Sequence, residues 1–113
     1  MCSILGYFNT SLSSNKIETY NQKMSHRGPD ASCVKEYLFR NKRLYLAHNR
    51  LAIQDLDSKA NQPMENDRFV MVFNGEIYNH YEIRNELSFK NFQTHSDTET
   101  LLWSFIELGV EKL

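Results

Sequence analysis

The sequence predicts an α+β domain with antiparallel sheets, and three observations lead to this fold class. Strand-like runs lie close together in the chain and are joined by short polar turns, not by the long crossovers of βαβ units. Segments with helical spacing accompany these runs, one after the first run and two after the last. The chain has 113 residues, of which 41% are hydrophobic and 24% charged, as in a globular domain. We therefore assign residues 1–113 to a single domain.

The amino-terminal half is predicted to hold one helix among its strands. Asn15 is expected to cap a helix over 16–24, because Glu18 follows it at capping-box spacing and apolar residues then recur at helical spacing. A hairpin turn is expected at 40–42. The runs that read as strands are 3–8, expected to be buried, 33–39, and 44–47 leading into 51–53.

The carboxy-terminal half begins with the most apolar run of the chain, 69–73, which we expect to be a central strand buried on both faces. Two helices follow. Asn79 is expected to cap the first and Ser96 the second, each with a glutamate three residues later. Gly109 has the position of a residue that ends the last helix.

Composition excludes several classes of function. The net charge of −1 offers no basic surface for nucleic acid, and no apolar run is long enough to span a membrane. With no signal peptide, we expect a cytoplasmic protein whose two cysteines, Cys2 and Cys33, are reduced. No metal-ligand cluster is apparent.

Cys2 stands directly after Met1 and opens a short apolar segment. If Met1 is removed, Cys2 carries a thiol and a free α-amine on one residue. Such an amine has a pKa of roughly 8, so near neutral pH it can take the thiol proton. The alternative is that Cys2 is simply a small residue at the start of a strand.

Five stretches together carry a resemblance to a known family. They resemble the glutaminase domain of class II glutamine amidotransferases of the Ntn-hydrolase superfamily, and within it the amino-terminal domain of glutamine-hydrolysing asparagine synthetases. The resemblance runs the whole length of the chain. The stretches are MCSILG at 1–6, SHRGPD at 25–30, HNRLAI at 48–53, NGEIYN at 74–79 and SDTE at 96–99.

The resemblance implies a layered sandwich of antiparallel sheets, incomplete in this chain, and hydrolysis of the side-chain amide of L-glutamine to glutamate and ammonia. The ammonia would pass to an acceptor activated by ATP on a synthetase domain or subunit. ATP and Mg²⁺ belong to that domain, which this sequence lacks, so no cofactor or metal is expected here. Family members continue beyond the point that corresponds to Leu113.

The resemblance also implies roles for catalytic residues. Cys2 is the nucleophile, and the side-chain amide of Asn74 and the backbone N–H of Gly75 form an oxyanion hole. Arg27 braces the loop beside the nucleophile. Alone, an Asn-Gly pair would indicate a tight turn, but a helix cap follows it instead of a pairing strand.

Substrate binding is expected from three further residues. Arg50 can bind the α-carboxylate through two N–H groups. Without the motif, the same residue would be interpreted as a strand arginine whose guanidinium is exposed to solvent. Glu76 and Asp97 are candidates for the α-ammonium group, and Asp97 is also favoured at a helix N-terminus by the helix dipole.

The remaining histidines and Cys33 are expected to have no catalytic role. His26 and His48 read as structural residues, and His80 and His95 as surface residues. Cys33 is expected to be an inert core thiol.

Two departures from the family leave an alternative open. The family normally has glycine where this chain has Ser3, and a side chain there is expected to crowd the substrate or shift the thiol. The missing strands leave sheet edges uncovered, so the isolated chain is expected to be weakly stable or to form oligomers. Both departures favour a non-catalytic or vestigial module that binds glutamine or a partner chain. A different Ntn hydrolase is disfavoured, because Arg50 and Asp97 together fit a free α-amino acid.

Overall fold

The computed structural model describes residues 1–53 and 55–113, and the chain divides into two units. The first unit comprises Met1–Ala52 and Asn61–Gly75, and the second comprises Ile53–Ala60 and Glu76–Leu113. Helices occur together with strands that pair antiparallel. The predicted α+β class with antiparallel sheets is confirmed.

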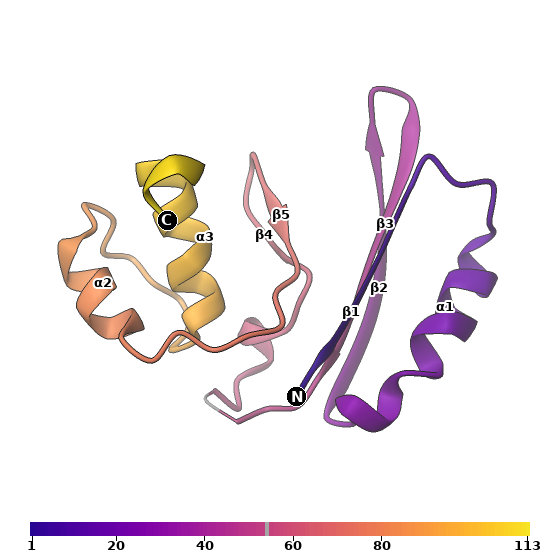
Figure 1. Ribbon diagram of the computed structural model, residues 1–113, viewed down its shortest axis with the longest axis horizontal. Helices are drawn as coiled ribbons and strands as arrows, with labels where there is room; N and C mark the ends of the chain where they lie inside the picture. Colours follow the sequence, from indigo (N-terminus) through magenta and orange to yellow (C-terminus); the bar gives the residue numbers. More distant parts are fainter. Residues whose placement is uncertain (54) are drawn as a thin grey trace. The chain divides into compact units, whose positions relative to one another are not determined.

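A three-stranded sheet with the order β1-β3-β2 forms the centre of the first unit (Figure 1). Its strands are β1 (Ser3–Phe8), β2 (Ala31–Phe39) and β3 (Lys42–Arg50). The hairpin between β2 and β3 is confirmed, because Arg40 and Asn41 both adopt positive φ, 49° and 61°, as a two-residue hairpin loop requires. β3 ends at Arg50, so residues 51–53, expected to continue this strand, lie outside it.

Helix α1 (Ser14–Gln22) packs on one face of this sheet (Figure 1). Ile17 of the helix and Ala47 of β3 are fully buried, and the rings of Tyr7 and Tyr20 stack at 6.3 Å. The expected cap was wrong: Ser13, with extended backbone, accepts a hydrogen bond from the N–H of Lys16 and begins the helix.

The expectation that β1 is a buried strand was also wrong. Alternate side chains of the strand point away from α1, and Ile4 and Phe8 are 45% and 53% exposed. Part of that second face is engaged by Glu65, whose carboxylate accepts hydrogen bonds from Lys35 and Tyr37 at 2.9 Å each. The strand is therefore amphipathic, because a helix covers only one of its faces.

The apolar run 69–73 does not form a central strand. Only Val70–Met71 (β5) is extended and paired, and its partner is the equally short β4 (Met64–Glu65). Asn66 holds the turn between them, since its side-chain oxygen accepts the N–H groups of Arg68 and Phe69. The run stays half-buried because this small hairpin pairs it on one side through two residue pairs.

The second unit is built from α2 (His80–Glu86) and α3 (Asp97–Leu108), with Leu87 and Leu102 in its core. Ser96 caps α3 as predicted, by accepting the N–H of Glu99 at 3.3 Å. Asn79 precedes α2 as expected, but its side chain makes no capping hydrogen bond.

Short 3₁₀ turns complete the two units, and a glycine ends the last long helix. Gly109 terminates α3 as predicted, with a φ of +75°. None of the helices in the described residues has the length and apolar character needed to traverse a bilayer. The 3₁₀ turns are η1 (Ser25–Arg27), η2 (Ser58–Ala60) and η3 (Val110–Lys112).

Candidate active site

Cys2 lies immediately before β1, beside the end of β3. The register pairs Ser3 with Asn49, so one step beyond the ladder Cys2 falls opposite Arg50. The Sγ atom of Cys2 accepts a hydrogen bond from the backbone N–H of Leu51 at 3.3 Å and lies 3.8 Å from the oxygen of the same residue.

Arg50 is buried rather than solvated, since only 8% of its surface is exposed. Its Nη1 donates a hydrogen bond to the side-chain oxygen of Asn61 at 2.8 Å. Because its neighbour Asn49 pairs with Ser3, Arg50 lies at the same end of the sheet as Cys2. A guanidinium fixed in this way is oriented before any substrate arrives.

The loop 25–30 fastens the ends of β1 and β3. Arg27 Nε donates to the backbone oxygen of Cys2 at 3.4 Å. Asp30 donates its N–H to the Arg50 oxygen at 2.9 Å, and its carboxylate accepts the N–H of Ala52 at 2.7 Å. Arg27 therefore contacts the residue that carries the sulfur. Asp30 contacts the two neighbours of Leu51, the residue whose N–H is bonded to that sulfur. Asp30 belongs to the SHRGPD stretch, but nothing in the sequence indicated that it would bond to Arg50 and Ala52.

Gly28 in the same loop is required by close packing. A Cβ atom at this position would fall on the backbone of Asn49 and Arg50, which a substituted residue could not displace cheaply. The loop and β3 therefore approach each other through their main chains.

Asn74 and Gly75 follow β5 by two residues and are both exposed. The residue before them, Phe73, is held through its backbone: its N–H donates to the side-chain oxygen of Gln62, and His48 hydrogen-bonds to its backbone. Within the described part of the chain, no hydrogen bond joins Asn74 or Gly75 to Cys2. They share the first unit with Cys2, Arg27 and Arg50.

His48 is buried to 1% exposure, in agreement with the structural role expected for it. Burial lowers its pKa to about 4, and the nearby Arg50 guanidinium acts in the same direction, while the bond to the Phe73 backbone opposes them. At neutral pH His48 is therefore uncharged, and its Nε2 has no hydrogen-bond partner among the described residues.

Glu76 and Asp97 belong to the second unit. Asp97 is the first residue of α3 and is 6% exposed, and its carboxylate accepts the backbone N–H of Ile77 at 2.9 Å. This bond joins the NGEIYN stretch to the SDTE stretch. Glu76 itself is exposed.

A buried ion pair, which the sequence did not single out, supports Asp97. Arg84 of α2 is 8% exposed and donates to Thr100 Oγ1 and to the backbone oxygens of Thr94 and Ser96 at 2.6–2.7 Å. Its Nη2 lies 3.9 Å from the carboxylate of Glu99. These contacts fix the chain that enters α3 immediately before Asp97. No sequence signal indicated an inward Arg84, because its i, i+4 neighbour His80 was itself expected at the surface.

Two expectations about other side chains were wrong. His80 is 5% exposed, not a surface residue, and burial and the Arg84 guanidinium lower its pKa. Cys33 lies in a strand as expected but is only half-buried. His26 and His95 are exposed.

Among the residues that the structure describes, no group of three or more His, Cys, Asp and Glu side chains could hold a metal ion.

The Ser3 side chain, which we expected to crowd the substrate or shift the thiol, is buried and hydrogen-bonded within the first unit. Ser3 is 4% exposed and its hydroxyl accepts a hydrogen bond from Asn49 Nδ2 at 2.9 Å. Asn49 in turn bonds to Asn21 of α1, so Ser3 points toward the helix-covered face of the sheet. Cys2, one residue earlier, makes its contacts with Leu51 instead.

Comparison with known proteins agrees with these motifs. The family described as "Glutamine amidotransferase domain" matches residues 1–113. Asparagine synthetase [glutamine-hydrolyzing] 2 of Oryza sativa subsp. japonica is 40% identical and covers 98% of this chain. Asparagine synthetase [glutamine-hydrolyzing] 1 of Arabidopsis thaliana and asparagine synthetase B [glutamine-hydrolyzing] of Escherichia coli K12 are each 38% identical, over 98% and 100% of the chain. The chain spans only 19–21% of the length of these relatives. It belongs to the glutamine amidotransferase domain family.

Proposed function

We propose that this chain is the glutaminase part of an asparagine-synthetase-like amidotransferase and that Cys2 hydrolyses the side-chain amide of glutamine. The observation that carries the proposal is the position of the Cys2 thiol, which lies opposite Arg50 in the strand register and accepts the N–H of Leu51 at 3.3 Å. The proposed nucleophile therefore lies immediately before β1, and the proposed carboxylate-binding cation lies at the end of the neighbouring strand β3.

The first step needs a base for the thiol. Removal of Met1 exposes the α-amine of Cys2, which takes the thiol proton directly or through a water molecule. The thiolate then attacks the amide carbon of the glutamine side chain, and the carbonyl oxygen acquires negative charge. Asn74 and Gly75 are the proposed donors to that oxygen, and losing one such donor typically costs about 10²–10³ in rate.

Collapse of the tetrahedral intermediate breaks the carbon–nitrogen bond. The nitrogen leaves as ammonia after receiving the proton held by the α-amine, and a glutamyl thioester remains on Cys2. Water attacks this thioester, again with the α-amine as base, and the products are glutamate and the free thiol.

The proposal assigns the α-carboxylate and the α-ammonium group of the glutamine substrate to charged residues of this chain. Arg50 binds the α-carboxylate, and Glu76 and Asp97 bind the α-ammonium group. Arg27 keeps its proposed bracing role, which its bond to the Cys2 oxygen supports. We also propose that the chain is part of a layered sandwich of the Ntn-hydrolase type. The ammonia would pass to a synthetase domain that activates an acceptor such as aspartate with ATP and Mg²⁺.

The test is the release of ammonia and glutamate from glutamine by the purified chain, with Cys2→Ala as control. The variant should be folded and inactive, because alanine is small and the position precedes the strand. Equal turnover by both proteins would remove Cys2 from the mechanism. Binding of glutamine without turnover by the wild-type chain, with Met1 shown to be removed, would support the non-catalytic module instead.

A further inference from the structure

The first unit contains a buried polar network that joins all the elements around its sheet. Asn49 of β3 is fully buried, and its Nδ2 lies 2.9 Å from Ser3 Oγ of β1 and 2.9 Å from the backbone and side-chain oxygens of Asn21 of α1. Asn21 Nδ2 donates to Ser32 Oγ of β2 at 2.9 Å and to Asn49 Oδ1 at 3.3 Å. The network thus has a Ser3 end and a Ser32 end.

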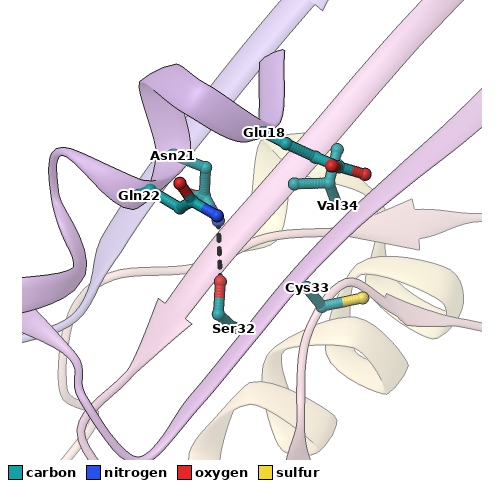
Figure 2. Close-up of a pocket in the computed structure, with 6 residues that line it drawn as sticks. All are labelled: Glu18, Asn21, Gln22, Ser32, Cys33 and Val34. Atoms are coloured by element: carbon teal, nitrogen blue, oxygen red, sulfur yellow. Dashed lines mark hydrogen bonds between the residues drawn. The ribbon is translucent and has the colours of Figure 1, made fainter. Parts of the chain in front are cut away.

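The two ends differ in their surroundings. The Ser32 end opens to a pocket of 210 Å³ between α1 and β2, in which Figure 2 shows the bond from Asn21 to Ser32. The Ser3 end is buried to 4% exposure and lies one residue from Cys2. Only the Ser3 end can act on the position of the nucleophile.

Cys2 needs such a support, because it lies before the first ladder pair of β1. In the proposed mechanism Cys2 is the terminal residue, and chain ends fray unless they are tied down. Backbone pairing to β3 begins only at Ser3, so fraying of that single residue would release the sulfur from the Leu51 N–H. A hydrogen bond from a fully buried amide to the Ser3 side chain opposes this fraying.

We propose that the Ser3–Asn49 hydrogen bond positions the Cys2 thiol at the end of the sheet, with Asn49 as the positioning residue. The expected effect on glutamine turnover rests on the proposed function. The expected effect on the order of the chain at Cys2 does not. The Ser3 side chain then holds the nucleophile in place rather than crowding it.

The test compares two serine-to-alanine variants at opposite ends of one network. Ser3→Ala and Ser32→Ala each remove one acceptor of a neutral hydrogen bond from an asparagine amide. The first readout is residue-resolved hydrogen exchange at the Leu51 amide, with the amide of Tyr45 as a reference for global opening. Ser3→Ala should lower protection at Leu51 by about fivefold, the factor that one neutral hydrogen bond corresponds to, whereas Ser32→Ala should leave the ratio of the two rates unchanged.

Turnover provides the second readout. Ser3→Ala should lower kcat for glutamine while KM stays near the wild-type value, Ser3→Thr should restore kcat by restoring the hydroxyl, and Ser32→Ala should match wild type. Equal effects of the two alanine variants on Leu51 exchange, or none from either, would overturn the proposal. If the wild-type chain does not hydrolyse glutamine, the proposed function fails, while the exchange experiment still decides whether Ser3 holds the end of the strand.

Discussion

The backbone N–H of Leu51 donates a hydrogen bond to the Sγ atom of Cys2 at 3.3 Å, and these residues are 49 positions apart in the chain. The contact exists because the β3 ladder ends at Arg50, which leaves the next N–H free of strand pairing and directed at sulfur. It distinguishes Cys2 from Cys33, whose sulfur has no hydrogen bond within the described residues.

The first prediction is selective labelling of that thiol. A glutamine-like electrophile should modify the chain once, at Cys2, because only this thiol combines an N–H donor with the neighbouring Arg50. Peptide mass mapping locates the adduct, and Cys33→Ser is the matched control that should label as wild type does. Modification of Cys33 in the wild-type protein would contradict the assignment.

The second prediction concerns Met1. While Met1 is present the nitrogen of Cys2 is an amide and cannot act as a base, so active material should have an intact mass short by one methionine. Its rate should rise with pH around roughly 8, as the α-amine loses its proton. A preparation shown by mass to retain Met1 and to hydrolyse glutamine at full rate would rule out the terminal amine as base.

The third prediction concerns Arg50. Because it is buried and bonded to Asn61, its guanidinium has a fixed orientation. Arg50→Ala should raise KM for glutamine by about 30-fold or more, corresponding to the roughly 2–5 kcal/mol that truncating a buried charge partner costs, and Arg50→Lys should recover little because the planar fork is lost. Arg43→Lys, at an exposed arginine of the same strand, is the control. Wild-type KM in a folded Arg50→Ala protein would remove Arg50 from substrate binding.

The fourth prediction concerns the buried ion pair of the second unit. Arg84→Met should lower the free energy of unfolding by about 3 kcal/mol or more, because it leaves the Glu99 carboxylate buried without its cation. Arg43→Met should cost at most about 1 kcal/mol, since its pairing with Glu36 is exposed. Urea unfolding of both variants measures the difference, and similar midpoints would show that Arg84 does not stabilise the unit.

The fifth prediction is a pH dependence caused by His48. The pKa of His48 is about 4 in the folded protein, whereas the ordinary value for histidine, which applies in the unfolded chain, is 6.5. Between these two pH values the unfolded chain therefore binds more protons than the folded protein. Stability from this group is complete above pH 6.5 and is lost as the pH falls toward 4, by about 3 kcal/mol in total. Urea midpoints at several pH values should fall less steeply in His48→Gln, whose amide can still donate to the Phe73 backbone. Parallel curves for the two proteins would contradict the burial of a neutral His48.

The sequence by itself determined the features that depend on neighbouring residues. The turn at Arg40–Asn41, the Ser96 cap and the glycine that ends α3 each require only a few adjacent residues, and all were predicted correctly. The motifs around Cys2 and Arg50 likewise indicated the family, because they state which chemical groups the chain carries and in which order.

Only the tertiary structure decided which of those groups are buried and what they contact. The apolar run 69–73 suggested a central strand, but a strand needs partners, and the small hairpin supplies only β4. Ser3 lies 46 residues from Asn49, so its burial depends on strand pairing and on α1, which no local pattern contains. The inward positions of His80 and Arg84 have the same origin, because helix packing selects the face that is covered.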